Sequence, residues 1–379
     1  MTTILFWGPL GKPGKAVTGG GETGNLRTIN MLSRNDIRII SVRKPYPPKR
    51  RSFMSPFTYS FALLLSVIKF AEYCLLSPHR PDVAQVSAFY GKLVYFEFLM
   101  LLFAKIANIP FVYEIRGGAM LKYYDRGSWL YKYIFSIILK KSDVIFSQGL
   151  EYNKFIFKKS GNHPTYYPNY VDYSHIQGFE INNGREKSDQ IKLIYFGRIV
   201  PDKGVETAIR TCAHLQRSGI NNRLQIIGEG QSDYIEYIVN LAEELEVGRL
   251  VSIEGPVPFP IIKEKLQKSH FFLFPTFNQM EGHSNALTEA MAFGVVPICS
   301  KQGFNETIVG ECGKILSVTA SESEYAHSIQ DIWKNNKWSE LSSLCRNTIE
   351  KKFTSEVVIP NIILKYQQVV NANRQQTIA

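Results

Sequence analysis

The chain has 379 residues, 45% hydrophobic and 20% charged, which describes a globular protein too long for one hydrophobic core. Two domains are therefore expected. The formal net charge of +11 is concentrated in residues 1–175, which hold 23 basic and 10 acidic side chains, whereas residues 176–379 hold 21 and 23. This asymmetry excludes a uniformly basic packaging protein. It indicates that the first half meets an anionic partner, which is a nucleic acid, a membrane surface or a phosphorylated substrate.

The five cysteines are scattered without a Cys-x-x-Cys pair, which argues against a disulfide framework or a zinc site and fits a reducing cytosol. The chain opens MTTILFWGPLGKPG, where a short apolar run lacks a preceding basic region and meets Gly and Pro at once. This opening predicts a buried strand rather than a signal peptide.

Short apolar runs alternate with helix-length segments, and this alternation predicts an α/β protein with parallel βαβ units in two series. The domain boundary is expected near 168–172, before a polar stretch at 181–190 that marks an exposed loop. The strands are expected at 3–8, 37–42, 82–87, 110–115 and 143–147, and then at 191–197, 224–228, 250–255, 271–275 and 295–300.

Two unusually apolar helices are expected at 57–76 and 93–107. Neither offers the about 20 uninterrupted apolar residues of a membrane span, so both are predicted to pack on the sheet. Before the first helix, basic and aromatic residues interleave, a pattern that suits binding to an anionic bilayer. Each basic residue near the lipid contributes about 1 kcal/mol to such binding. A solvated charged loop fits the same residues. They are Arg43, Lys44, Tyr46, Lys49, Arg50, Arg51, Phe53 and Phe57.

The most specific pattern is Pro275-Thr276 followed by EGHSNALTEAMAFG at 281–294. Ser284 is a natural N-cap and Gly294 a helix terminator, so the amides near the helix start predict an anion site at the carboxyl edge of the sheet. Glu289 shares a helix face with Asn285, where a carboxylate suits two vicinal hydroxyls of a ribose. Simple pairing of Glu289 with a neighbouring base is the alternative.

A second pattern, GRIVPDKG at 197–204, directly follows an expected strand. The next helix is amphipathic and packs its apolar stripe inward, so Arg198 and Lys203 are left at the sheet edge, where a diphosphate leaving group needs neutralising. Gly228 and Gly230 end the following strand. A third pattern, GGGETG at 19–24, satisfies the dinucleotide fingerprint only weakly, because 10 residues separate it from the first strand.

Together these motifs resemble the retaining glycosyltransferases of family 4, which have the GT-B fold of two facing Rossmann-like domains. The resemblance also rests on PNYVD at 168–172, IIGEG at 226–230 and the closing segment FTSEVVIPNIILKYQQVV at 353–370. It implies an acceptor domain at 1–170, a donor domain at 171–352, and a helix from 353–379 that returns to the first domain.

The resemblance implies that Glu289 binds the donor ribose, that Arg198 and Lys203 bind the diphosphate, and that Glu281 contacts the transferred sugar. It implies retention of the anomeric configuration without a metal or other cofactor, and the chain contains no Asp-x-Asp motif. Further donor-binding candidates are Ser284, Asn285, Ala286, Leu287, His283, Gly197, Gly228 and Gly230, and the acceptor or crevice candidates are Gly20, Gly21, Glu22, Arg116, Gly117 and Gly118.

Two positions leave alternatives open. Many family members carry a histidine where this chain has Arg116, which suits an acidic or phosphorylated group or else pairs with Glu114 or Asp125. His283 either donates to a phosphate or fills the helix entry.

The leading hypothesis is a cytoplasmic, peripheral membrane glycosyltransferase of bacterial-type surface polysaccharide biosynthesis. Its expected partners are a nucleotide-sugar donor, a lipid-linked or soluble glycan acceptor and an anionic membrane surface. A nucleotide-sugar 2-epimerase of the same fold is the nearest alternative. Charge alone favours a nucleic-acid-binding protein, but no recognisable RNA or DNA module is present.

Overall fold

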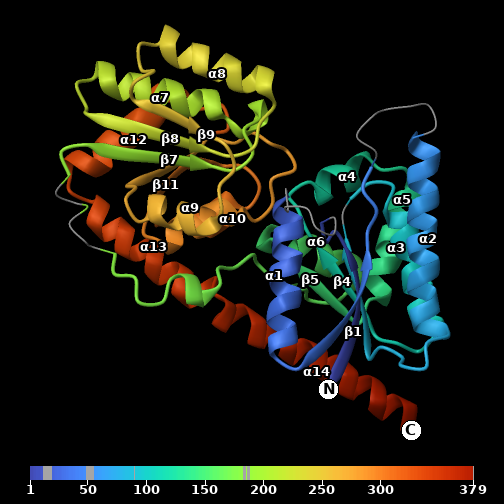
Figure 1. Cartoon of the computed structure of the whole chain (residues 1–379). Coiled ribbons are helices and arrows are strands. Elements are labelled where there is room, and N and C mark those ends of the chain that lie inside the picture. The colour runs from blue at the N-terminus through green and yellow to red at the C-terminus, as the bar shows by residue number, and fades with distance from the viewer. Residues whose placement is uncertain (12–18, 48–54, 89, 182–184, 186–187, 379) are drawn as a thin grey trace. The chain divides into compact units, whose positions relative to one another are not determined.

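The computed structural model describes residues 1–11, 19–47, 55–88, 90–181, 185 and 188–378. The chain divides into two compact units, shown in Figure 1. Unit 1 comprises Met1–Pro168 and Glu356–Ala379, and unit 2 comprises Asn169–Ser355. The last helix is thus part of the same unit as the first strand.

Unit 1 is built on a six-stranded parallel sheet with the order β2-β1-β3-β4-β5-β6. Its strands are β1 (Thr2–Gly8), β2 (Ile37–Arg43), β3 (Val83–Ala88), β4 (Phe111–Ile115), β5 (Val144–Ser147) and β6 (Thr165–Tyr166). Its helices are α1 (Gly20–Arg34), α2 (Ser55–Leu75), α3 (Val94–Ile106), α4 (Met120–Arg126), α5 (Trp129–Lys141), α6 (Asn153–Ser160) and α14 (Ser355–Ile378).

Unit 2 has a second six-stranded parallel sheet, with the order β12-β11-β10-β7-β8-β9. Its strands are β7 (Ile191–Phe196), β8 (Asn222–Ile227), β9 (Val251–Glu254), β10 (Phe271–Phe274), β11 (Val296–Ser300) and β12 (Lys314–Leu316). Its helices are α7 (Val205–Arg217), α8 (Ser232–Glu244), α9 (Phe259–Leu266), α10 (Asn285–Ala292), α11 (Asn305–Val309), α12 (Glu322–Lys334) and α13 (Trp338–Lys352).

The α/β prediction is confirmed, and each of the ten expected strands is present with ends displaced by at most two residues. Two strands were not expected. β6 and β12 have two and three residues and lie at sheet edges, beside β5 and β11. Such short segments carry too few residues for a periodic pattern to identify them.

The two charged residues of helix α3 each have a polar partner in the structure. Glu97 of α3 is fully buried and accepts a hydrogen bond of 2.6 Å from the Tyr113 hydroxyl on β4. Lys105, near the end of α3, instead pairs with Asp143 at the surface, at 2.6 Å. One buried carboxylate thus has a dedicated donor, as a low-dielectric interior requires.

Helix α2 is long and apolar enough to cross a membrane by length and composition, over Pro56–Leu75. One such helix is weak evidence, since a core helix of a soluble protein meets the same criterion. Its inward residues Leu63, Val67 and Phe70 are at most 2% exposed, which fits the predicted packing on the sheet. The predicted bilayer-binding residues Lys49, Arg50, Arg51 and Phe53 lie outside the described residues.

Helix α14 joins unit 1 through buried polar contacts as well as apolar ones. The Tyr366 hydroxyl donates to Gln85 Oε1 on β3, and the Tyr366 ring meets Phe146 of β5 edge-on at 5.7 Å. Farther along the helix, Arg374 pairs with Asp82 at 2.8 Å. These contacts hold the C-terminal helix against the first sheet, which the sequence places some 280 residues earlier.

Candidate functional site

The candidate donor site lies where the strand order of unit 2 reverses. From β7 the chain proceeds to β8 and β9 on one side, and later to β10, β11 and β12 on the other. The loops that follow β7 and β10 therefore diverge at the carboxyl edge of two adjacent strands. In open parallel sheets this switch point is where ligands bind. The motif at 197–204 falls in the first of these loops, and the motif at 275–294 covers the second loop and helix α10 that follows it.

Glycines bring the loops after β7 and β8 into backbone contact. A Cβ on Gly228 would lie 1.7 Å from the Gly197 carbonyl oxygen, and one on Gly230 would lie 2.8 Å from the carbonyl oxygen of Ile199. The Ile199 amide donates to the Glu229 carbonyl at 2.8 Å, which extends the pairing beyond the strands. The glycines predicted for donor binding thus also permit close packing of the loop that holds Arg198.

Arg198 has a fixed backbone and an exposed side chain. Its carbonyl oxygen accepts a hydrogen bond of 2.6 Å from the hydroxyl of Tyr195, whose side chain is fully buried. Burial raises the pKa of this tyrosine, and the nearby charge of Glu281 raises it further. The tyrosine therefore stays a neutral donor at physiological pH. The guanidinium of Arg198 is available to an incoming anion because its side chain is exposed.

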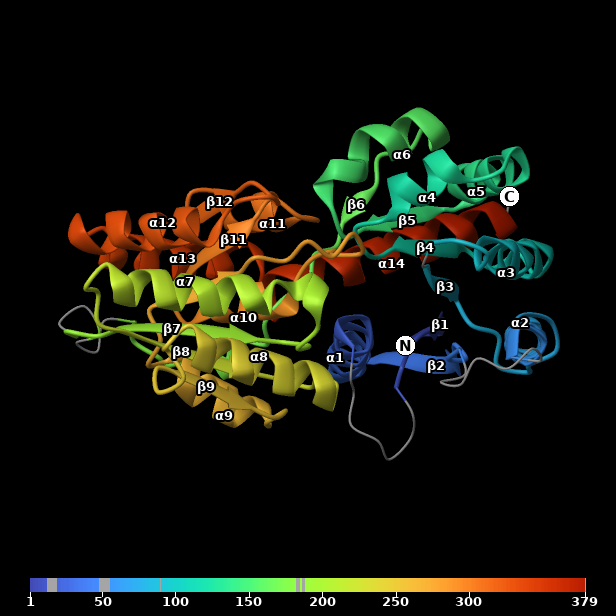
Figure 2. The ribbon, with the colours of Figure 1, turned by 90° about the horizontal axis from the view of Figure 1, so that it is seen from above.

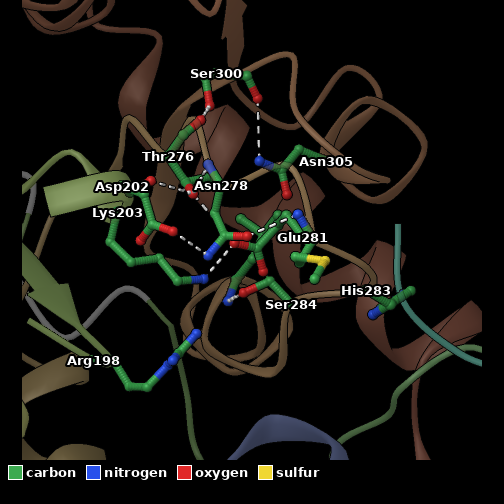
Figure 3. A network of polar contacts seen from close by, with 12 residues as sticks. Arg198, Asp202, Lys203, Thr276, Asn278, Glu281, His283, Ser284, Ser300 and Asn305 are labelled. Carbon is green, nitrogen blue, oxygen red and sulfur yellow. Dashed lines mark hydrogen bonds and ion pairs between the residues drawn. The ribbon is translucent and has the colours of Figure 1, made fainter. Parts of the chain in front are cut away.

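Lys203 and Glu281 form an ion pair between the two loops, although 78 residues separate them (Figure 3). The two side chains are only 12% and 9% exposed. The Lys203 ammonium also lies 5.5 Å from the centre of the Phe274 ring, and Thr276 Oγ1 lies 3.2 Å from Glu281 Oε2. The structure thus joins two residues that the sequence assigned to separate parts of the donor.

A network of hydrogen bonds holds together the two loops that carry this ion pair (Figure 3). Asn278 Nδ2 donates to Asp202 Oδ2 at 2.7 Å, and the Phe277 amide donates to the Asp202 carbonyl at 2.9 Å. These two bonds clamp the loop that carries Lys203 to the loop that carries Glu281. On the other side, Ser300 Oγ donates to the Thr276 carbonyl, and Asn305 Nδ2 donates to the Ser300 carbonyl at 3.1 Å.

Sequence reasoning missed Asn278, Ser300 and Asn305. Ser300 is the last residue of β11, so its place at the end of a buried strand was the available signal. Asn278 and Asn305 stand in loop and short-helix positions whose polar residues look like ordinary surface residues in one sequence. Their value comes from partners that only the fold brings near.

Helix α10 begins as predicted, with Ser284 as its N-cap. The family resemblance implies that the backbone amides of Asn285, Ala286 and Leu287 hold phosphate oxygens, and that of Leu287 already donates to Ser284 Oγ, at 3.3 Å. Asn285 and Ala286 stand ahead of it in the first turn, and Glu289 follows in the second turn, 9% exposed. The positive end of the helix therefore remains at the switch point, with a carboxylate one turn behind.

His283 lies at the entry of α10, and its role toward a phosphate stays a prediction. It is 4% exposed, its ring lies 5.2 Å from that of Phe353, and its Nδ1 lies 3.4 Å from Thr288 Oγ1. Its carbonyl oxygen accepts a bond of 2.6 Å from Asn169 Nδ2, in the predicted PNYVD segment.

In unit 1, the glycine cluster forms a helix start rather than a loop. Gly20, Gly21 and Glu22 make the first turn of α1, and Gly19 is its N-cap with extended backbone. The family resemblance implies a Gly-Gly loop that lines the crevice here, but the structure begins the helix one residue after Gly19. Glu22 is half-buried there, and its role toward a substrate stays a prediction.

Arg116 forms a buried ion pair with Glu114, the structural alternative considered for it. The two side chains are 4% and 2% exposed, and Gln85 Nε2 donates to the other oxygen of Glu114 at 2.8 Å. The guanidinium also lies 5.3 Å from the centre of the Tyr167 ring. Gly117 and Gly118 follow Arg116 in the chain and are both half-buried, and Gly117 has a φ of +85°.

Replacing Arg116 by alanine is therefore expected to lower the free energy of unfolding by about 3–5 kcal/mol, because it leaves the Glu114 carboxylate buried without its ion partner. Thermal unfolding measures this, with the exposed Arg80→Ala as control. An unchanged melting temperature, combined with a loss of activity, would contradict the structural role and restore the acceptor role.

Among the described residues, no cluster of three or more His, Cys, Asp or Glu side chains is arranged to hold a metal ion.

Comparison with known proteins identifies the family of unit 2. Residues 177–352 match the family model Glycosyl transferases group 1, so this part of the chain is a domain of that group. Protein CapJ of Staphylococcus aureus is 25% identical over 272 residues, which are 70% of this chain and 63% of that protein. The capsular polysaccharide biosynthesis glycosyltransferase CapM of the same species is 27% identical over 194 residues, 48% of each. The chain thus spans less than two thirds of the length of these relatives.

Solved structures share the fold over nearly the whole chain. Sucrose-phosphate synthase from Thermosynechococcus elongatus has a TM-score of 0.75 at 16% identity, covering 98% of this chain and 100% of that one. Anabaena HepE in complex with UDP has a TM-score of 0.70 at 14% identity, covering 99% and 100%. At such identities the likeness shows the fold alone, and it confirms the GT-B fold class.

Proposed function

We propose that the protein is a glycosyltransferase that moves a sugar from a nucleotide-diphosphate-sugar donor to a glycan acceptor in bacterial surface polysaccharide biosynthesis. The observation that carries the proposal is the buried Lys203–Glu281 pair at the switch point of a Glycosyl transferases group 1 domain. The relatives' names support the pathway, since CapM is described as a glycosyltransferase of capsular polysaccharide biosynthesis. A structural neighbour was solved with UDP, which supports a nucleotide donor.

In the proposed mechanism, the acceptor hydroxyl oxygen forms a bond to the anomeric carbon of the donor on the face that the diphosphate leaves. The bond between that carbon and the diphosphate oxygen breaks, and the departing oxygen takes the hydroxyl proton, so the configuration is retained. Lys203 and Arg198 neutralise the charge that develops on the diphosphate, and the start of α10 adds its positive end. No metal is needed in this scheme.

Glu281 and Glu289 position the donor in this proposal. Glu289, on the inner side of α10, accepts hydrogen bonds from the ribose hydroxyls, and Glu281 contacts the transferred sugar while it orients Lys203. Because the Glu281 carboxylate is held by Lys203 and faces Thr276, it is preorganised before the donor arrives. Positioning and charge stabilisation then account for the rate enhancement.

The acceptor is proposed to be linked to a lipid diphosphate, with the enzyme peripheral on the cytoplasmic face of the membrane. The strongly basic composition of unit 1 supports this, with 25 basic and 10 acidic residues against 19 and 23 in unit 2. A nucleotide-sugar 2-epimerase is the second candidate within the same fold, because it would bind the same donor at the same switch point.

Two measurements test the proposal. A thermal-shift panel of nucleoside diphosphates and their sugars should show stabilisation by one base, through linkage between binding and folding. Incubation of that nucleotide-sugar with lipid-linked acceptors should then release the nucleoside diphosphate only when acceptor is present. Isomerised donor without transfer would favour the epimerase, and the absence of stabilisation by any nucleotide would contradict both.

Arg198→Ala should lower kcat/KM for transfer about 100-fold or more, because one preorganised charge on the leaving group is lost. The melting temperature should not change, since the side chain is exposed. Arg217→Ala, at the exposed end of α7, is the matched control. Equal activity of the two variants would contradict the role of Arg198.

A further inference from the structure

Helix α2 exposes an apolar stripe on its outward face. Five large apolar side chains of this helix are between 42% and 64% exposed. Their spacing places them within an arc of about 100° on the helix surface, over about three turns. These residues, named here the α2 stripe, are Phe57, Phe61, Leu64, Leu65 and Ile68. Single exposed apolar residues are ordinary, but a contiguous stripe indicates an interaction surface.

The opposite face of α2 anchors it in unit 1. Leu63, Val67, Phe70 and Cys74 are at most 2% exposed, and α2 packs on α3 and on β2 and β1. Trp7 of β1 donates to Ser66 Oγ of α2 at 3.1 Å. Extraction of the helix to span a bilayer would expose this core. The stripe therefore suits a helix that lies in the plane of a membrane surface rather than one that crosses it.

The start of α5 adds aromatic residues to the same side of unit 1. Helices α2, α3 and α5 lie next to one another in this order (Figure 2). Trp129 and Tyr133 of α5 are 78% and 61% exposed. Because α2, α3 and α5 all run back along a parallel sheet, their first residues share the carboxyl edge of the strands. Exposed Trp and Tyr are the residues that settle at a membrane interface, where one end is apolar and the other hydrated.

Positive charge accompanies these residues. Unit 1 holds 25 basic and 10 acidic residues. At the carboxyl edge of its sheet, Arg43 ends β2, Lys92 precedes α3 and Arg126 ends α4, and all three are exposed. Cations beside an exposed apolar helix complement an anionic bilayer.

We propose that the α2 stripe, together with Trp129 and Tyr133, docks unit 1 on an anionic lipid bilayer, with α2 lying in the interface and Arg43, Lys92 and Arg126 against the headgroups. This inference deepens the proposed function, on which it rests for the lipid-linked acceptor. It makes the membrane a partner that binds through described side chains, independently of the basic segment at 49–51.

Vesicle partitioning of the full chain tests this surface, with Phe61→Gln, Leu65→Gln and Ile68→Gln combined in one variant. The wild-type protein should bind vesicles that contain phosphatidylglycerol, and the triple variant should bind about tenfold more weakly or worse. A control variant changes three exposed apolar residues outside the stripe, Val239, Ile261 and Leu364, to Gln and should bind like the wild type. Pure phosphatidylcholine vesicles and high salt should both weaken wild-type binding.

Trp129 provides a second readout that needs no change in the stripe. Trp7 and Trp338 are buried and Trp333 is half-buried, so Trp129 dominates the solvent-exposed fluorescence. Anionic vesicles should shift the emission to shorter wavelengths in the wild type and not in Trp129→Phe.

Three results would overturn the inference. These are equal partitioning of the wild type and the triple variant, no emission shift, or a wild-type dimer that the triple variant converts to a monomer, which would make the stripe an interface between copies. Nucleotide stabilisation is measured on the same samples. If no nucleotide stabilises the protein but vesicles bind, the proposed function is contradicted and membrane binding stands. If a nucleotide stabilises the protein but vesicles do not bind, membrane binding is contradicted and the proposed function stands.

Discussion

Replacing Lys203 by alanine is expected to abolish sugar transfer and also to destabilise unit 2. The ammonium is one of the two cations proposed to neutralise the departing diphosphate, so kcat should fall by about two to three orders of magnitude. Its removal also leaves Glu281, 9% exposed, without its ion partner, at a cost of about 3 kcal/mol or more. Transfer assays with saturating donor and thermal unfolding measure the two effects separately.

Glu281→Gln separates charge from shape in the same pair. Transfer should be lost as in Lys203→Ala, and in the double variant Lys203→Ala, Glu281→Gln the stability loss should be smaller than the sum of the two single losses. Lys265→Ala is the matched control, because it breaks the more exposed Lys265–Glu254 pair of the same unit and should cost at most about 1 kcal/mol. Near wild-type turnover in either Lys203→Ala or Glu281→Gln would show that the site assignment is wrong.

Gly204→Ala is expected to destabilise unit 2 strongly, although it adds only one methyl group. Gly204 starts α7 with φ of +72°, and a Cβ there would lie 2.1 Å from the Pro275 carbonyl oxygen. The backbone must therefore move at the contact between the two loops that hold Lys203 and Glu281. We expect the free energy of unfolding to fall by more than about 3 kcal/mol. A left-handed backbone costs a residue with a Cβ about 1–2 kcal/mol, and the clash adds the rest.

Gly219→Ala isolates the second term, because Gly219 has φ of +73° but no atom within 4 Å of an added Cβ. It should lose only about 1–2 kcal/mol and keep full donor affinity. Melting temperatures compare the two variants, at about 2–4 °C per kcal/mol for a unit of this size. Equal melting temperatures would mean that the loops move apart without cost and that the contact does not define the site.

Local patterns were sufficient for much of the fold. Alternation of buried strands with helix-length segments predicted ten of the strands and both apolar helices, because burial on both faces of a parallel strand leaves a continuous apolar run. The pattern also placed Lys203 and Glu281 in loops after strands. It failed where an element was too short to show a period, as in β6, and at Gly20, where glycines that favour a loop instead begin a helix.

The candidate site was predictable only in part, for a physical reason. A motif identifies which residues leave a strand at the sheet edge, but a hydrogen bond depends on which strands are neighbours. In the sequence, Asn278 is an ordinary loop residue. It can donate to Asp202 because β10 and β7 are neighbours in the sheet, which brings their following loops together. Arg116 had two interpretations of equal weight, and only burial beside Glu114 favours the structural one.

By itself, the sequence determined the α/β class, the succession of strands along the chain and the concentration of positive charge in the first half, since periodicity and composition are local properties. The tertiary structure decided three other features. It joined Lys203 to Glu281 across 78 residues, turned Arg116 inward, and left the α2 stripe facing outward. Each depends on which elements pack together, and an apolar helix reads the same in sequence whether its second face meets protein or solvent.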